Sequence, residues 1–336
     1  MKKQPTAIIS LGTLLGGMEM DAFRLAKQLH NDMDVTLIAK AGSKLESEYR
    51  TACDQLGIRI ETIAFKTFFS PSIIFGARRI VKKYNINNVI FFGASEMRSL
   101  YFSFLGLNIN LIIRHGMKKT SPKKDFLHRL VYSNVNWHVT ICEYLSGNVK
   151  EIIPFGKNAK LKLIYSALRY LPTDTKEPVI RDLNPVKLLH VARIAPGKGQ
   201  IDAIKACKSL YDRNIPFELH LVGEIFPPFR TRFESVLADT VYKDSIFVHG
   251  FCNNVPEFLS NSDIFFYPSS GEGLSNSFIE ALANGLICVT YDNTSFPELR
   301  ELGFIIHIAN NDDLADLNNK LMDAIESVSY THLRAH

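Results

Sequence analysis

The chain has 336 residues, of which 46% are hydrophobic and 22% are charged. This length accommodates two domains of about 150 residues each. No run approaches the ~20 consecutive apolar residues of a membrane span, and the N-terminus lacks the apolar core of a signal peptide. The five cysteines are scattered without C-x-x-C spacing. They are therefore expected to be reduced thiols in a cytoplasmic protein.

The net charge of +5 is divided unevenly along the chain. Residues 1–170 carry 25 Lys and Arg against 12 Asp and Glu, or +13, whereas residues 171–336 carry 14 against 22, or −8. A basic half predicts an anionic partner, and a membrane surface, a phosphorylated or acidic glycolipid and nucleic acid are the alternatives. No basic strand with interleaved aromatics and no recognition-helix pattern is present, so we expect no nucleic acid to bind. Peripheral contact with an anionic membrane, at the inner face of the cell membrane, fits the charge.

The N-terminal half alternates apolar runs with helical patterns. Strands are predicted at residues 7–11, 34–39, 59–65, 88–92, 110–114 and 137–142. With helices between them, these strands indicate an α/β fold with a parallel, doubly wound sheet. Gly16 and Gly17 follow the first strand, where glycines allow the backbone to pass close to a ligand. By spacing alone, an ordinary turn between a strand and a helix explains them equally well.

Two stretches of this half place cations beside other informative residues. Residues 68–83 join Phe68, Phe69 and Phe75 to four cations. A helix packed by its apolar side is the favoured interpretation, and a segment inserted at a membrane surface is the alternative. Farther on, His115 ends a predicted strand, and a lysine cluster follows it at Lys118, Lys119, Lys123 and Lys124. A solvated loop explains the lysines as well as contact with an acceptor phosphate or a membrane does.

The C-terminal half begins after a segment that is typical of a linker. Residues 172–185 combine three prolines with alternating charges. We therefore predict an N-terminal domain at 1–168, a linker at 169–186 and a C-terminal domain at 187–327.

A buried strand, a turn and a helix at 201–211 follow the linker, and the turn carries Arg193 and Lys198. A planar guanidinium and a compact ammonium at the carboxyl end of a strand suit a diphosphate, although solvated loop cations are an alternative.

A second turn lies about eighty residues later. An apolar strand at 264–267 leads into a Gly-rich loop and then a helix, which places Glu272 on the loop and Glu280 about two turns into the helix. Backbone N–H groups at such a helix N-terminus can hold an anion. The spacing of the two glutamates is weak evidence alone, because an exposed first-turn Glu and an exposed helix Glu are common.

Together, the stretches 188–200 and 269–281 resemble the C-terminal half of family 4 glycosyltransferases, which are retaining enzymes of the GT-B architecture. Residues 247–251, 254–257, 262–264 and 296–299 follow in the order of that family. The resemblance implies two Rossmann-like domains facing a cleft, the first binding an acceptor and the second a nucleotide-diphosphate sugar. Around residues 115–129 the chain is also similar to enzymes that build lipopolysaccharide core and other surface polysaccharides.

The resemblance implies roles for individual residues. Arg193 and Lys198 are expected on the diphosphate, Glu272 on hydroxyls of the transferred sugar and Glu280 on the ribose, while His115 lies near the sugar. Donor contacts are expected at Gly16, Gly17, Gly250, Gly273, Leu274, Ser275 and Asn276. No protein nucleophile is expected, and without a D-x-D motif flanked by apolar residues we expect no metal and no cofactor. The chain departs from many relatives at Ser166 and Ala167, where they carry Asn-Gly.

Other functions share this architecture. A GT-B sugar-nucleotide epimerase is one alternative, a phosphorylase with a pyridoxal-bearing lysine is another, and a non-enzymatic binding protein for anionic polymers is a third. UDP is the expected donor nucleotide. Residues 328–336 resemble a reading frame of a common sequencing-library adapter, which predicts a non-native tail and a truncated C-terminal domain.

Overall fold

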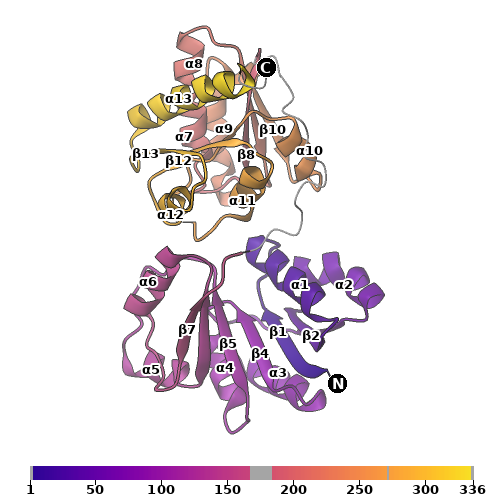
Figure 1. The fold of residues 1–336 in the computed structure, drawn as a ribbon. Coiled ribbons are helices and arrows are strands. Elements are labelled where there is room, and N and C mark those ends of the chain that lie inside the picture. The colour runs from indigo at the N-terminus through magenta and orange to yellow at the C-terminus, as the bar shows by residue number, and fades with distance from the viewer. Residues whose placement is uncertain (1–2, 167–183, 271, 334–336) are drawn as a thin grey trace. The chain divides into compact units, whose positions relative to one another are not determined.

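The computed structural model describes residues 3–166, 184–270 and 272–333, and the chain divides into two units, Met1–Tyr165 and Ser166–His336 (Figure 1). Each unit is a parallel sheet with helices on both faces, which confirms the predicted pair of Rossmann-like domains. Most of the predicted linker, through residue 183, lies outside the described residues. Among the helices that are described, none combines the length and the hydropathy that a membrane span requires.

The N-terminal unit contains one seven-stranded sheet. Its strands are β1 (Gln4–Ser10), β2 (Met33–Lys40), β3 (Arg59–Ile63), β4 (Asn88–Phe92), β5 (Asn110–His115), β6 (Val135–Thr140) and β7 (Lys160–Leu163). Its helices are α1 (Gly17–Leu29), α2 (Lys44–Leu56), α3 (Pro71–Lys83), α4 (Met97–Phe104), α5 (Phe126–Tyr132) and α6 (Glu143–Ile152). The sheet order is β3-β2-β1-β4-β5-β6-β7, with all neighbours parallel. The order reverses between β1 and β4, and ligands of such sheets bind beyond the strand ends at this point.

Apolar side chains fill both faces of this sheet. One face packs against α1 and α2, with Ala22 and Leu45 fully buried, and the other packs against α3, α4, α5 and α6. Strands buried on both faces read as continuous apolar runs, so their positions were recognisable in the sequence.

Helix α3 and the loop before it carry the aromatic and cationic residues of 68–83. Ile73 and Ile80 pack into the core, which confirms the favoured interpretation as a packed helix. Phe68, Phe69 and Phe75 nevertheless remain 60%, 57% and 70% exposed. The packed helix and the loop before it therefore leave three aromatic side chains exposed to solvent.

The C-terminal unit contains a six-stranded sheet in the order β10-β9-β8-β11-β12-β13, again with all neighbours parallel. Its strands are β8 (Val186–Val191), β9 (Phe217–Val222), β10 (Ile246–Gly250), β11 (Ile264–Phe266), β12 (Ile287–Tyr291) and β13 (Ile306–Ala309). Its helices are α7 (Gln200–Ala206), α8 (Lys208–Asp212), α9 (Arg230–Ala238), α10 (Val255–Ser260), α11 (Asn276–Ala283), α12 (Phe296–Glu301) and α13 (Leu314–Leu333), with short 3₁₀ turns at Pro227–Phe229 and Lys243–Ser245. Here the order reverses between β8 and β11.

One sequence expectation differs from the helices of this unit. The single helix predicted at 201–211 is two helices, α7 and α8, separated at Cys207. The predicted non-native segment begins inside α13, where Val328 is only 3% exposed, and its last residues, 334–336, lie outside the described residues.

Candidate active site

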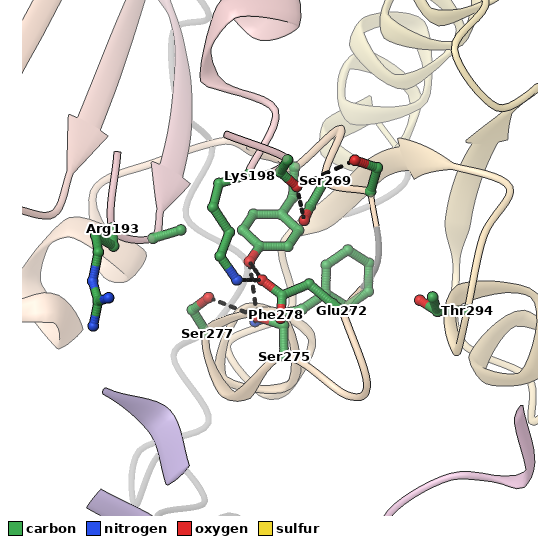
Figure 2. Close-up of polar contacts among 12 residues, drawn as sticks. Arg193, Lys198, Ser269, Glu272, Ser275, Ser277, Phe278 and Thr294 are labelled. Atoms are coloured by element: carbon green, nitrogen blue, oxygen red, sulfur yellow. Dashed lines mark hydrogen bonds and ion pairs between the residues drawn. The ribbon is translucent and has the colours of Figure 1, made fainter. Parts of the chain in front are cut away.

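The loops after β8 and β11 meet at the point where the strand order of the C-terminal sheet reverses. The first loop carries Arg193 and Lys198 and leads into α7, and the second carries Glu272 and leads into α11. Because β8 and β11 are parallel neighbours, both loops leave the same edge of the sheet. Lys198 and Glu272, which are 74 residues apart in the sequence, are therefore side by side (Figure 2).

A charged pair lies between the two loops. The ammonium of Lys198 donates to Oε1 of Glu272, and the phenol of Tyr267 donates to the same oxygen over 2.9 Å. The side chains of Lys198 and Glu272 are 32% and 17% exposed, so the pair is partly shielded from water. Burial, and then the negative charge of Glu272, raise the pKa of Tyr267 well above its usual value. The phenol therefore keeps its proton and acts as a donor to the carboxylate.

Backbone hydrogen bonds hold the two loops against each other. The carbonyl of Gly197 accepts from the backbone N–H of Ser270 at 2.9 Å and from the hydroxyl of Ser269 at 3.1 Å. The carbonyl of Ser269 accepts in turn from Nδ2 of Asn293 at 2.9 Å. The turn bearing Lys198 is thus fixed relative to the turn bearing Glu272.

Glycine is required at the tightest approach of these loops. Gly199 has a φ of +85°, and a Cβ there would overlap the carbonyl group of Pro268. Both the backbone conformation and the close contact exclude a larger residue without a shift of the loop.

Helix α11 begins directly after the second loop. Ser275 caps it by accepting from the N–H of Phe278 at 3.4 Å, and its hydroxyl donates to the Tyr267 oxygen at 3.3 Å. In the first turn of the helix, the hydroxyl of Ser277 donates to the carbonyl of Val191, the last residue of β8, at 2.7 Å. The N-terminus of α11, where backbone N–H groups and the helix dipole favour anions, is therefore attached to both strands.

Two buried polar residues support the first loop. His190 Nε2 donates to the carbonyl of Lys198 at 2.8 Å, and Gln200 Nε2 donates to the carbonyl of Arg193 at 3.0 Å. Burial lowers the pKa of His190 to about 4, so its imidazole is neutral near pH 7. Neither residue was predicted for the site. A polar residue inside an apolar strand, as at His190, is the signal that could have identified one of them.

Other predicted donor residues lie farther from the charged pair. Figure 2 shows the Arg193 side chain extended away from Lys198 and Glu272. Glu280 lies on α11 and is half-buried, whereas Gly250 ends β10, two strands away from β8 in the sheet. The predicted backbone positions Gly273, Leu274, Ser275 and Asn276 form the short connection from Glu272 into α11.

The glycine turn of the N-terminal unit lies at the corresponding strand reversal. Gly16 caps α1 and donates its N–H to Oε2 of Glu19 at 3.0 Å, while Gly17 is the first residue of the helix. Glu19 is 8% exposed and is therefore occupied in shaping this turn.

His115 ends β5, as predicted, and is buried there. Its side chain is 1% exposed, and its Nε2 lies 2.9 Å from Nδ1 of His138 on the neighbouring strand β6. Burial, and then the neighbouring His138, lower the pKa of His115 well below its usual value. In this arrangement the ring is neutral and packed in the core, and its role near the sugar stays a prediction. The register of β5 and β6 places His138 beside His115, and residue patterns in the sequence do not specify that register.

The lysine cluster after β5 divides into two kinds of residue. Lys118 and Lys124 are exposed, and the ammonium of Lys118 lies 5.6 Å from the centre of the Tyr144 ring. Lys119 and Lys123 are half-buried. The simple interpretation as a solvated loop therefore holds for two of the four lysines.

Known proteins are similar to this chain in sequence and in fold. The family described as "Glycosyl transferases group 1" matches residues 173–331. The capsular polysaccharide biosynthesis glycosyltransferase CapH of Staphylococcus aureus is 25% identical over 291 residues, covering 82% of this chain and 78% of CapH. The amylovoran biosynthesis glycosyltransferase AmsK of Erwinia amylovora is 30% identical over 125 residues, covering 35% of this chain and 30% of AmsK.

Coverage differs among these relatives. Six curated glycosyltransferases match, and this chain spans only 30% to 41% of the length of five of them, AmsK included. Among solved structures, HepE of Anabaena in complex with UDP and glucose superposes with a TM-score of 0.79 at 15% identity, covering 98% of this chain and 92% of HepE. At that identity the likeness establishes the GT-B fold.

Proposed function

We propose that the whole chain transfers a sugar from a nucleotide-diphosphate donor to a glycan or glycolipid acceptor, because its residues 173–331 match the glycosyl transferases group 1 family. The observation that carries the proposal is the pairing of Lys198 with Glu272 at the strand reversal of the C-terminal sheet. A cation suits the donor diphosphate, and a carboxylate suits the hydroxyls of a sugar. The names of CapH and AmsK favour an acceptor in surface polysaccharide synthesis.

The chemistry needs charge stabilisation more than a protein nucleophile. In retaining transfer with attack on the donor's own face, the bond from the sugar C1 to the diphosphate oxygen breaks and an acceptor oxygen bonds to C1. The acceptor proton passes to the leaving diphosphate. Lys198, Arg193 and the N-terminus of α11 would stabilise the negative charge that develops there. Glu272 would exchange its bond with Lys198 for sugar hydroxyls, and Glu280 would hold the ribose.

We propose UDP as the donor nucleotide, with no metal and no cofactor required. The UDP in the HepE complex supports this choice. Thermal unfolding of the purified chain with UDP, GDP and ADP tests it, because a ligand at 100 times its Kd stabilises the native state by about 2.7 kcal/mol. We expect a shift with UDP alone. The Lys198→Ala chain should lose the shift, and Lys208→Ala, which breaks an exposed ion pair with Asp212, should keep it. A wild-type chain that none of the three nucleotides stabilises would contradict the proposed function.

A further inference from the structure

The N-terminal unit contains a cavity of about 130 Å³ that none of the predicted donor residues lines. It lies between the loop after β4, the start of α4 and one side of α5. Arg98, Lys123 and His128 supply its charged and polar side chains, and Val131 and Tyr132 supply apolar ones. Because the loops after β4 and β5 leave the same edge of a parallel sheet, this cavity is at the ligand-binding edge of the unit.

The cations of this cavity have no carboxylate partner in the part of the chain that the structure describes. Neither Arg98 nor Lys123, the two cations that line it, forms an ion pair there, and neither does Lys119, which lies on the same loop as Lys123 but outside the lining. The carboxylate nearest in sequence, that of Asp125, is engaged in capping α5 and in pairing with His128. Burial and the charge of Lys123 lower the pKa of Lys119, and burial and the charge of Arg98 lower the pKa of Lys123. Arg98 and Lys123 line the same cavity, so an anion placed there would relieve the repulsion between their like charges.

Helix α6 holds the lysine loop in place. The backbone N–H of Lys119 donates to Oδ1 of Asn148 at 2.7 Å, and Nδ2 of Asn148 donates back to the carbonyl of Lys119 at 3.0 Å. The N–H of Lys123 donates to the carbonyl of Ile152 at 3.0 Å. The two half-buried lysines are thus positioned by three hydrogen bonds, which lowers the entropic cost of ordering them around a ligand.

Helix α5 presents a different surface away from the cavity. His128, Val131 and Tyr132 line the cavity, whereas Phe126 is 82% exposed. Other exposed apolar side chains accompany it, namely Leu127, Leu130 and, on the lysine loop, Met117. An apolar surface with a cationic cavity beside it matches a molecule that has an anionic head and a hydrocarbon tail.

We propose that this cavity binds the phosphate or diphosphate of a lipid-linked acceptor, with the hydrocarbon chain against the exposed side of α5. Arg98 serves as a planar fork for phosphate oxygens, and Lys123 as a point charge. The inference rests on the proposed function, since it names the acceptor class of that reaction. It also leaves the sugar-bearing end of the acceptor at the same sheet edge as the glycine turn after β1.

Calorimetric titration of the full chain tests this site without turnover. The probes are inorganic pyrophosphate and farnesyl diphosphate, added in the presence of saturating UDP so that the donor site is occupied. We expect one saturable site for each probe, with Arg98→Ala and Lys123→Ala each weakening both by tenfold or more. Lys123→Arg, which keeps the charge, should restore binding. Lys150→Ala, an exposed position on α6, is the matched control and should bind as the wild type does.

Phe126→Ser separates the two parts of the ligand. We expect this substitution to weaken the binding of farnesyl diphosphate severalfold and to leave the affinity for pyrophosphate unchanged. Farnesyl diphosphate that binds no more tightly than pyrophosphate would overturn the lipid assignment and identify a soluble phosphate. Absence of pyrophosphate binding, or binding that Arg98→Ala and Lys123→Ala do not alter, would overturn the site itself. UDP binding is measured separately in the same samples, so its failure would count against the donor proposal and not against this cavity.

Discussion

Lys198 and Glu272 form an ion pair across 74 residues of sequence, joining the loops that follow two neighbouring parallel strands. Each charge compensates the other while the site holds no donor. Under the proposed function, a donor would bring its diphosphate to the Lys198 ammonium and its hydroxyls to the Glu272 carboxylate, so we expect the two side chains to give up their mutual bond together. The pair would then serve as a preformed arrangement for a ligand that is anionic at one end and rich in hydroxyls at the other.

Replacing Lys198 with alanine should reduce turnover much more than stability. Removing one charge-stabilising donor from an active site costs a factor of about 10² to 10³ in kcat. The Lys198 side chain is 32% exposed, and an ion pair that water still reaches contributes about 1 kcal/mol to folding. Steady-state assays with the donor, combined with urea unfolding, measure the two effects. A folded Lys198→Ala chain with wild-type turnover would remove Lys198 from the diphosphate site.

Glu272→Gln should separate nucleotide binding from sugar transfer. The amide oxygen can still accept the Tyr267 phenol, but the ammonium of Lys198 loses its negative partner and becomes more available to the diphosphate. We expect UDP to bind at least as tightly as in the wild type and kcat to fall by about tenfold or more. Calorimetry with UDP and an assay of product formation are the measurements. UDP affinity that falls in parallel with kcat would contradict the assignment of Glu272 to the sugar.

Gly199→Ala should destabilise the loops after β8 and β11, here called the donor loops, and Gly250→Ala provides a matched comparison. Both glycines have positive φ, +85° and +67°, but a Cβ at Gly199 meets the Pro268 carbonyl group whereas a Cβ at Gly250 meets open space. We expect Gly250→Ala to lower the free energy of unfolding by about 1–2 kcal/mol, because of the backbone conformation alone. Gly199→Ala should lower it by more. Urea unfolding decides the order. Equal losses would mean that the two loops do not approach as closely as described.

The buried His138 should make the chain less stable in mild acid. Burial lowers its pKa from 6.5 to about 4, so between these pH values the unfolded chain binds a proton that the native chain does not. The free energy of unfolding should therefore be highest above pH 6.5 and fall by up to about 1.4 kcal/mol per pH unit toward pH 4. His138→Phe should reduce this slope by up to the amount that corresponds to uptake of one proton on unfolding, as measured by urea unfolding at a series of pH values from 7 to 5. An unchanged slope would show that His138 is not held neutral.

The aromatic surface of the N-terminal unit should support binding to anionic vesicles. Phe68, Phe69 and Phe75 are all more than half exposed, on a half of the chain that carries a net charge of +13. We expect co-sedimentation with phosphatidylglycerol vesicles that weakens with salt, and Phe75→Ser should reduce it severalfold. The control Tyr211→Ser alters an exposed aromatic of the C-terminal unit. If both substitutions have the same effect, the surface around α3 is not the contact.

Much of the fold was predictable because its signals are local. The runs at 88–92 and 110–114 are apolar and bounded by polar residues, and they became β4 and β5 within one residue. The Gly-rich turn before α11 was recognisable for the same reason. The break at Cys207 was not, because the pattern of 201–211 continues through it without Gly or Pro.

The site was predictable only where its parts are carried by loops. Lys198 and Glu272 lie in turns with strong signals, and the structure brings them together. The burial of His115 depends on His138, 23 residues later, and on the register of two strands. Tyr267 was recognised as part of a strand, but its hydrogen bond to Glu272 follows from the path of the loop and not from residue type.

The bonds between the two donor loops also bear on how this domain could be redesigned. The Gly197 carbonyl accepts from both Ser269 and Ser270, and Ser277 reaches back to Val191 at the end of β8. A chimera that imports only one loop from another protein would break these bonds at the seam and leave backbone groups unpaired. The two segments, about seventy residues apart, are therefore one exchangeable module, and a change of donor preference by grafting would require moving them together.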